Sequence, residues 1–434
     1  MSNVLEQATA AAQQRNWSLL NQCLQQLPLG KKATHPEVGL VPLNDRDLEQ
    51  VLNLALDVLE AGDFQERWEV AKVIPKLGEM AIAPLIKILE DEDAELELRW
   101  FTGRILGEFN HPTAITALVD LVRTSEDEDL AEMAGTALSN LGNSAIDALG
   151  SLLSEPESRL LATRSLAQIR RPEIIAPLLS VVRDPDVAVR STAIEALTSF
   201  HDSRIPPILL EALDDHAAVV RKEAAIGLGL RSDLREELDL LNRLKPLLYD
   251  FNRDVCQQAA IALGRLGTDE AAVALFNVLK SPATPVPLQI DFIRALSWVE
   301  TDKTLDYLQQ ALTITSLDCV LEIVRVLGRV EKLILKTKAA QILIDFLNSE
   351  HPVRQSDAVK QAVAQAWGEL GDVSAIDALI GLLADPATSV KLHAIAALKN
   401  FPTAYQQLEQ LAADAQLTPA LEEGIAIALA EWKV

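Results

Sequence analysis

The sequence predicts an all-α, right-handed solenoid (superhelix) of stacked helical hairpins. Three observations carry this prediction: an internal repeat with a period of about 30 residues, an Ala- and Leu-rich composition, and Asp-Pro or Gly turns between apolar stretches. Hydrophobic residues make up 49% of the 434 residues but aromatic residues only 4%, which favours helices over a β-sandwich. Because one such hairpin cannot bury its apolar faces alone, neighbouring hairpins must stack into one continuous core.

The repeat is clearest around one turn motif. Asp184-Pro-Asp-Val-Ala-Val-Arg190 recurs one period later as Asp215-His-Ala-Ala-Val-Val-Arg221, and Asp385-Pro-Ala-Thr-Ser-Val-Lys391 is a third copy. An apolar stretch precedes each copy, and an Ala-rich stretch follows it. The unit is therefore a helix, an Asp-Pro turn, a second helix, and a Gly or polar turn. We expect the Pro in the first turn of the second helix and the Asp to accept from free N–H groups there.

The chain divides into three segments in this interpretation. Residues 1–29 form an amphipathic helical pair, and residues 30–44, which contain Pro and Gly without periodicity, form a linker or a surface strap. Residues 45–434 form a repeat array of about a dozen hairpins, which ends in a capping helix. Glycines at the ends of second helices, as in Ala262-Leu-Gly-Arg-Leu-Gly267, are expected to allow left-handed caps or close helix packing.

The net charge of −24 is unevenly distributed. Residues 1–158 hold 27 acidic and 11 basic residues, residues 159–265 hold 15 of each, and residues 266–434 hold 21 acidic and 13 basic residues. This balance argues against binding to nucleic acid or to anionic lipid, because phosphate affinity comes from Lys and Arg. The apolar share also excludes a disordered acidic tail.

Two acidic runs fall at turns of successive repeats, and such turns stack along one edge of a solenoid. Solubility is the ordinary role of such an edge, and docking of a partner with a basic face is the functional alternative. Neither run has the spacing of a Ca²⁺ loop. The eight carboxylates are those of Glu90, Asp91, Glu92, Asp93, Glu126, Asp127, Glu128 and Asp129.

Arginines also recur with the repeat. Arg159, Arg190 and Arg221 follow one another at intervals of exactly one period, with Arg99 as a looser earlier member. The favoured interpretation is a structural ladder in which each Arg bonds a turn Asp of its own or a neighbouring repeat. The alternative is that these arginines grip an acidic partner.

Other positions are better candidates for contact with a partner or a ligand. Arg104, Arg164 and Lys222 lie elsewhere on second helices and are expected to be exposed binding groups. Trp100 and Phe101 beside Arg99 are the one place where the sequence suggests a pocket for a flat aromatic ligand. Neither a phosphate-binding Gly-rich loop with Lys nor a Gly-x-Ser-x-Gly motif occurs, so we expect no catalytic residues and no metal ligands.

The ends and the cysteines indicate a cytoplasmic protein. The N-terminal residues show no basic and apolar pattern of a signal peptide, and no apolar run is long enough to span a membrane. Cys23, Cys256 and Cys319 are far apart in the sequence, which favours a reducing compartment and core packing over disulfides or a zinc site.

The period and pattern resemble the HEAT repeat in its short form. The stretches Asp184–Leu197, Asp215–Leu228 and Asp385–Leu398 are similar to the repeats of the phycobilisome lyase group, which includes the E/F-type phycocyanobilin lyases. HEAT arrays in general imply a non-enzymatic protein-binding scaffold or assembly factor. The narrower resemblance implies phycobiliproteins as partners and, as the alternative function, a phycobilin lyase or a chaperone that handles a linear tetrapyrrole.

One enzymatic HEAT family is disfavoured. Deoxyhypusine hydroxylase holds a di-iron centre with repeated His-Glu pairs, whereas none of the six histidines of this chain is followed by Glu. No cofactor is therefore expected, apart from the bilin that the lyase alternative would imply.

Overall fold

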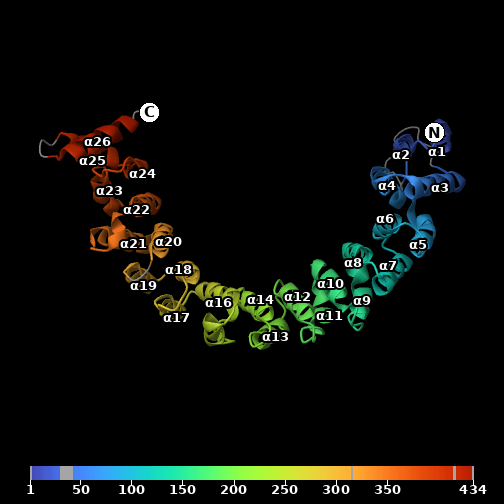
Figure 1. Ribbon diagram of the computed structural model, residues 1–434, viewed down its shortest axis with the longest axis horizontal. Helices are drawn as coiled ribbons and strands as arrows, with labels where there is room; N and C mark the ends of the chain where they lie inside the picture. The colour runs from blue at the N-terminus through green and yellow to red at the C-terminus, as the bar shows by residue number, and fades with distance from the viewer. Residues whose placement is uncertain (1, 30–42, 314–315, 414–416, 433–434) are drawn as a thin grey trace. The chain divides into compact units, whose positions relative to one another are not determined.

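The computed structural model describes residues 2–29, 43–313, 316–413 and 417–432, and all regular secondary structure in these residues is helical. Consecutive helices form hairpins that follow one another along the chain (Figure 1). The predicted all-α solenoid is confirmed. By its contacts the chain divides into two compact units, Met1–Phe200 and His201–Val434, which we call unit 1 and unit 2.

Unit 1 has two helical layers. The second helices of its hairpins pack side by side, α6 on α8, α8 on α10 and α10 on α12, while α5, α7 and α9 form the other layer. The elements of unit 1 are α1 (Ser2–Gln13), α2 (Trp17–Gln26), α3 (Asp45–Ala61), α4 (Phe64–Val70), η1 (Ile74–Ala81), α5 (Ile82–Leu89), α6 (Leu96–Leu106), α7 (Pro112–Thr124), α8 (Glu128–Asn140), α9 (Asn143–Leu152), α10 (Arg159–Gln168), η2 (Pro172–Ile174), α11 (Ile175–Leu179) and α12 (Val187–Leu197), where η marks a 3-10 helix.

Unit 2 repeats the same layering. Its second helices α14, α16, α18, α20, α22 and α24 pack in succession. Its elements are α13 (Ile205–Ala212), α14 (Ala218–Gly229), η3 (Ser232–Leu234), α15 (Leu240–Leu244), η4 (Lys245–Tyr249), α16 (Arg253–Leu266), α17 (Asp269–Leu279), α18 (Val286–Val299), α19 (Asp302–Leu312), α20 (Leu317–Gly328), α21 (Leu333–Asn348), η5 (Pro352–Gln355), α22 (Asp357–Leu370), η6 (Val373–Ala375), α23 (Ile376–Leu382), α24 (Thr388–Leu398), α25 (Ala404–Ala412) and α26 (Pro419–Glu431).

The first segment of the chain packs against the start of the array. Helix α1 contacts α2, and α2 contacts α3 and α4. Asn44 caps α3, because its side chain accepts from the backbone N–H of Asp47 at 2.9 Å. Most of the expected strap, residues 30–42, lies outside the described residues.

The Asp-Pro turns differ in detail from the expectation. Pro185 lies in the turn itself, before α12 begins at Val187. The carboxylate of Asp184 accepts from the N–H of Asp186, two residues on, at 2.9 Å, and Asp186 in turn caps α12 by accepting from Ala188 at 2.7 Å. The first Asp therefore shapes the turn, and the second one caps the helix.

Glycines take both of the expected roles at the end of α16. Gly267 adopts the left-handed conformation, with φ of +67°, where the helix ends. Gly264 lies where α16 meets α18, and a Cβ atom there would come within 2.6 Å of the backbone oxygen of Ala295. Close contact of these two helices thus depends on the missing side chain.

Candidate functional site

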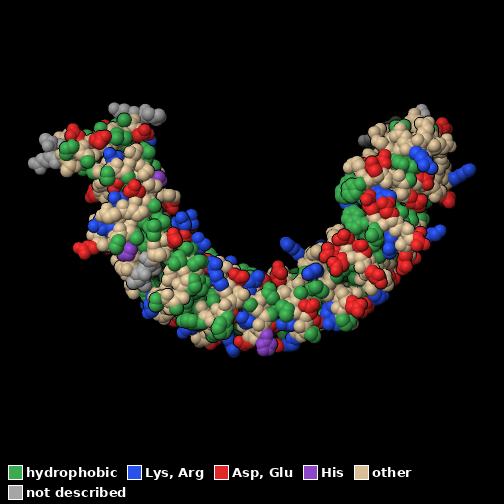
Figure 2. All heavy atoms as spheres, viewed as in Figure 1, with side chains coloured by type: hydrophobic (Ala, Val, Ile, Leu, Met, Phe, Trp, Pro, Cys, Tyr) green, Lys and Arg blue, Asp and Glu red, His purple; other side chains and the backbone are tan. Residues whose placement is uncertain are grey.

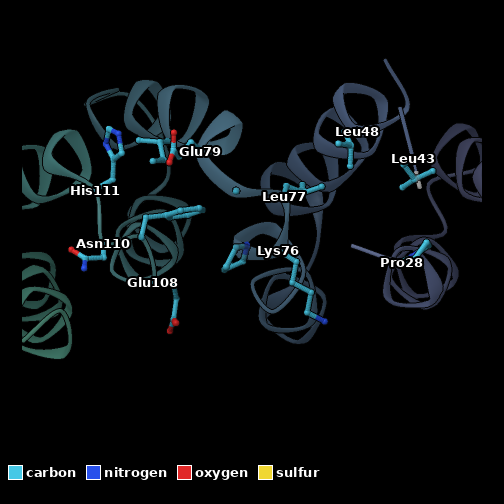
Figure 3. A pocket seen from close by; sticks show the side chains of 13 residues that line it. Pro28, Leu43, Leu48, Lys76, Leu77, Glu79, Glu108, Asn110 and His111 are labelled. Carbon is cyan, nitrogen blue, oxygen red and sulfur yellow. The ribbon is translucent and has the colours of Figure 1, made fainter. Parts of the chain in front are cut away.

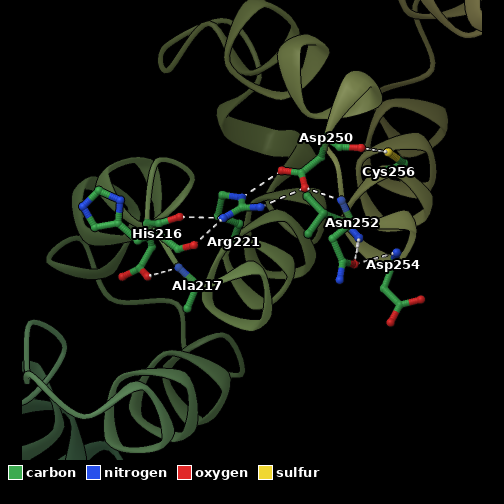
Figure 4. A network of polar contacts seen from close by, with 9 residues as sticks. His216, Ala217, Arg221, Asp250, Asn252, Asp254 and Cys256 are labelled. Atoms are coloured by element: carbon green, nitrogen blue, oxygen red, sulfur yellow. Dashed lines mark hydrogen bonds and ion pairs between the residues drawn. The ribbon is translucent and has the colours of Figure 1, made fainter.

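The predicted arginine ladder forms at Arg159 and Arg221, each of which bonds a turn Asp of the following repeat. Arg159 bonds the carboxylate of Asp184 at 2.7 Å, one repeat further on. Arg221 binds Asp250 of the following repeat with two parallel contacts of 2.8 Å, from Nε and Nη2. Its Nη1 also donates to the backbone oxygen of Asp215 at 2.7 Å (Figure 4). Arg99, the looser member, donates to the backbone oxygen of Leu89 at 3.0 Å.

The ladder also sets the electrostatics of its turn. The hydrogen bond from Arg221 holds the pKa of Asp250 below its usual range, and the same bond raises the pKa of Arg221. Burial, aided by the nearby Asp250 carboxylate, raises the pKa of the Cys256 thiol, which donates to the backbone oxygen of Asp250 at 3.1 Å. A thiol with a raised pKa is a weak nucleophile at neutral pH, so this network suits packing and not catalysis.

An aromatic cluster lies on α4 and α6 of unit 1. The rings of Phe64 and Trp68 stack with centroids 6.3 Å apart, and both pack against Phe101, at 5.2 and 6.4 Å. The guanidinium of Arg104 lies over the Trp68 ring at 3.9 Å. Phe101 is fully buried, whereas Phe64 is 57% exposed. Figure 2 shows an apolar patch at α4 and α6, and we call Phe64, Trp68, Trp100, Phe101 and Arg104 the aromatic cluster.

Beside this cluster is a hollow of about 470 Å³ between α6 and α8. Trp100 and Arg104 line it, together with the carboxylates of Glu108, Asp129 and Glu132. The pocket suggested by the sequence is thus placed differently from the expectation. Arg99 does not belong to the residues that line this hollow, and Phe101 is fully buried within the aromatic cluster instead of facing a ligand.

The two acidic runs lie at corresponding ends of neighbouring hairpins. Glu90–Asp93 follow α5 and are exposed, whereas Asp127 caps α8 by accepting from the N–H of Leu130 at 2.9 Å. Glu128 and Asp129 belong to the first turn of α8 and not to the loop, which corrects their expected place. Since α5 packs on α7 and α6 on α8, both runs lie along the same edge of unit 1, where Figure 2 shows red side chains. We call these eight residues the acidic edge.

Two other predicted binding groups are already engaged with acidic neighbours. Arg164 on α10 lies 4.0 Å from Glu132 on α8, and both side chains are exposed. This pair extends the surface around the hollow from α6 to α10. Lys222 in unit 2 bonds its neighbour Glu223 at 2.8 Å and is only partly exposed. Arg104 and Arg164 therefore border one surface of unit 1, and Lys222 belongs to unit 2.

A larger hollow of about 710 Å³ lies at the other edge of unit 1 (Figure 3). Pro28, Leu43 and Leu77 supply apolar walls. In Figure 3 the side chains of Lys76 and Glu108 point away from those of Glu79 and His111. The polar groups thus do not converge on one point, as a catalytic site requires.

Unit 2 has a further surface that was not predicted from the sequence. On α18 and α20 of unit 2, the buried carboxylates of Asp291 and Glu322 lie beneath exposed arginines. Asp291 and Glu322 are separated by one period of the repeat, and so are Arg294 and Arg325. The repeat period was therefore the signal that could have identified them.

In the described part of the chain, no group of three or more His, Cys, Asp or Glu side chains is placed to hold a metal ion. Nor does any described helix have the length and apolar character needed to cross a membrane.

Family membership follows from the sequence repeats. The family model for HEAT repeats matches residues 52–139, 82–160, 146–229 and 206–289, which together cover more than half of the chain. The chain belongs to the HEAT-repeat family. The hairpins within residues 52–289 are accordingly HEAT repeats, and the arginine ladder links successive HEAT repeats through their turns. No curated protein matches the chain.

The chain is also similar to known structures at low sequence identity. A homology model of the full-length AP-3 complex matches 90% of this chain and 91% of its own chain, with 11% identity and a TM-score of 0.52. Importin beta matches 96% of this chain and 66% of its own, with 14% identity and a TM-score of 0.46. An engineered protein matches 81% of this chain and 99% of its own chain, with 21% identity and a TM-score of 0.40. At 11% identity the likeness to the AP-3 structure is one of fold alone.

Proposed function

We propose that the chain is a non-enzymatic protein-binding scaffold, and that unit 1 binds a partner with a basic face. The observation that carries the proposal is the exposed aromatic cluster beside carboxylates. Phe64 is 57% exposed although it stacks on Trp68. Glu108, Asp129 and Glu132 border the same surface.

The composition of this surface suits protein recognition. Tryptophan and arginine dominate binding energy at interfaces, especially when they surround a pocket. The stacking of Arg104 over Trp68 at 3.9 Å holds both side chains in place, so less conformational entropy is lost when a partner binds. The acidic edge would attract a basic face over a distance and raise the association rate.

The setting of the scaffold is a finer proposal. The resemblance of residues 184–197 and 215–228 to phycobilisome lyase repeats supports phycobiliproteins, or other proteins of photosynthetic assembly in the cytoplasm, as partners. An assembly factor is favoured over a lyase, because the polar groups around the hollows of unit 1 include no nucleophile paired with a base.

Neutralising the acidic edge is expected to weaken binding. We would capture the partner by affinity purification with the intact chain, and then change each Glu of the edge to Gln and each Asp to Asn. Asp127→Asn retains an N-cap for α8. Partner affinity should fall by about tenfold or more. The affinity should also depend less on salt concentration, because the variant lacks a charge attraction that salt screens.

The matched control is the same number of Glu→Gln and Asp→Asn changes on other exposed acids of unit 1, such as Glu49 and Asp57. Equal affinities of the two variants would show that the acidic edge serves solubility alone. Recovery of no stable partner by the intact chain would count against the scaffold itself.

The bilin alternative has its own test. The hollow beside Trp100 has an aromatic wall, but its three carboxylates would repel the propionates of a linear tetrapyrrole. We therefore expect a titration with phycocyanobilin to give no absorbance shift and no retention of the pigment on gel filtration. A saturable shift that disappears in Trp100→Ala would establish a bilin site and overturn this expectation.

A further inference from the structure

We propose that the face formed by α16, α18 and α20 in unit 2 binds an acidic segment of a partner protein. This face is distinct from the surface of unit 1 and has the opposite charge preference. Figure 2 shows blue side chains gathered where Figure 1 places these helices. The inference thus goes beyond the proposed binding of a basic partner, and it gives the scaffold a second type of binding surface.

Two buried carboxylates are the foundation of this face. The side chains of Asp291 on α18 and Glu322 on α20 are each only 7% exposed. Arg294 donates from Nε to Glu322 at 2.6 Å, and Arg325 bonds the other oxygen of the same carboxylate. Arg253 on α16 donates to Asp291 at 3.3 Å. Each carboxylate is thus covered by guanidinium groups from its own helix or a neighbouring one.

The arginines nevertheless remain open to solvent. Their side chains are 58%, 54% and 53% exposed for Arg253, Arg294 and Arg325. A guanidinium has five N–H donors. In each of these three arginines, the described bonds to carboxylates use one or two of the five. The remaining donors are available to a carboxylate of a partner.

The buried acids hold these arginines in a fixed arrangement. Burial acts to raise the pKa of Glu322, but the hydrogen bond from Arg294 and the charges of Arg294 and Arg325 hold it below its usual value. The carboxylate is therefore ionised at neutral pH and orients both guanidinium groups. Arginine presents its donors as a planar fork that matches a carboxylate, and side chains that are already ordered lose less entropy on binding.

An exposed tryptophan adds an apolar anchor point. Trp298 on α18 is 48% exposed, and the guanidinium of Arg265 on α16 lies 5.9 Å from its ring. Trp298, Arg294 and Arg329 line a hollow of about 520 Å³ between α18 and α20, which also has apolar walls such as Val326. A hollow of this kind suits one large apolar side chain of a peptide.

The same surface argues for a protein segment over a nucleic acid. Glu300 and Glu331 also line the hollow and contact each other, so acidic side chains interrupt the basic area. A continuous phosphate backbone needs a longer basic track, and the whole chain carries a net charge of −24. A short segment with a few carboxylates and one apolar side chain matches the basic patch, the acidic border and the hollow together.

The test uses the full chain and a fluorescein-labelled synthetic peptide in which glutamates flank one phenylalanine. Fluorescence anisotropy should show saturable binding that weakens with salt. The double variant Arg265→Gln/Arg329→Gln and the single variant Trp298→Ala should each lose about tenfold or more in affinity. These changes leave the bonds to Asp291 and Glu322 in place, and circular dichroism checks that the helices persist. Arg243→Gln on α15 is the matched control, because it removes an exposed arginine of unit 2 from another helix.

The outcomes separate the alternatives. No saturable binding of the peptide, or equal affinities for the double variant and Arg243→Gln, would overturn the proposal. Displacement of the peptide by a single-stranded oligonucleotide of equal charge at lower concentrations would assign the face to nucleic acid instead. A peptide with lysines in place of the glutamates should not bind. These measurements test unit 2 alone, so their failure is distinguishable from failure of the partner site in unit 1.

Discussion

Replacing Arg221 with alanine is expected to destabilise unit 2 by about 3–5 kcal/mol. The change removes both 2.8 Å contacts to Asp250, whose side chain is only 10% exposed, and the bonds to the backbone oxygens of Asp215 and His216. The carboxylate of Asp250 would then be a mostly buried charge that has lost its cationic partner. An unpaired buried charge costs far more than the net value of the pair.

Because each repeat of a solenoid contacts mainly its neighbours, the loss should be local at first. Native-state hydrogen exchange should show faster exchange for amides in α14 and α16 than in α22 and α24 of the same protein. Arg243→Ala, which removes an exposed arginine of unit 2, is the control and should cost less than about 0.5 kcal/mol. Equal effects of the two substitutions would contradict a structural ladder.

The destabilisation by Arg221→Ala should also depend on pH. The folded-state pKa of Asp250 is lowered by the hydrogen bond from Arg221. A carboxylate with a lowered pKa contributes stability above its unfolded pKa, and that contribution is lost as the pH falls through the folded pKa. The difference in unfolding free energy between wild type and Arg221→Ala should therefore be largest at neutral pH, and it should decrease below about pH 4. A difference that stays constant from pH 7 to pH 3 would contradict this account.

The ladder shows what one sequence can predict. The regular spacing of Arg159, Arg190 and Arg221 fixes equivalent positions on successive repeats, so the sequence predicts a repeated contact. It does not decide the geometry of each contact. Arg221 grips Asp250 through Nε and Nη2, whereas Arg159 reaches Asp184 through Nη1 and turns its Nε to the backbone oxygen of Leu153. Which guanidinium nitrogens bind the Asp depends on how the two repeats stack, and the residues next to each Arg in the sequence do not indicate this stacking.

The aromatic cluster shows what the sequence could not predict, namely which residues of different hairpins come together. Trp100 and Arg104 lie four residues apart, so they share one face of a predicted helix. Phe64 and Trp68 come from another hairpin. Phe64 meets Phe101 and Trp68 meets Arg104 only in the folded chain, where side chains of α4 and α6 come together. The arginines over Asp291 and Glu322 obey the repeat period, but their repeats lack the Asp-Pro motif that identified the clearest copies.

Replacing Phe101 with alanine is expected to cost about 3–5 kcal/mol in the stability of unit 1. The ring is fully buried, and it contacts the rings of Phe64, Trp68 and Trp100 at centroid distances of 5.2, 6.4 and 5.3 Å. Its removal would leave a cavity at the centre of the aromatic cluster, which the surrounding helices can close only in part. Thermal unfolding and hydrogen exchange in α4 and α6 would measure the loss.

Phe64→Ala is the matched substitution, because it removes the same side chain from the exposed part of the same cluster. Phe64 is 57% exposed, so its loss should cost about 1 kcal/mol or less of stability. If the cluster is the anchor of a partner, Phe64→Ala should still weaken partner binding by about tenfold or more. A stable Phe64→Ala variant that binds the captured partner as tightly as wild type would leave the cluster as a packing feature alone. If Phe64→Ala lowers the stability of unit 1 as much as Phe101→Ala does, Phe64 belongs to the core of unit 1 instead.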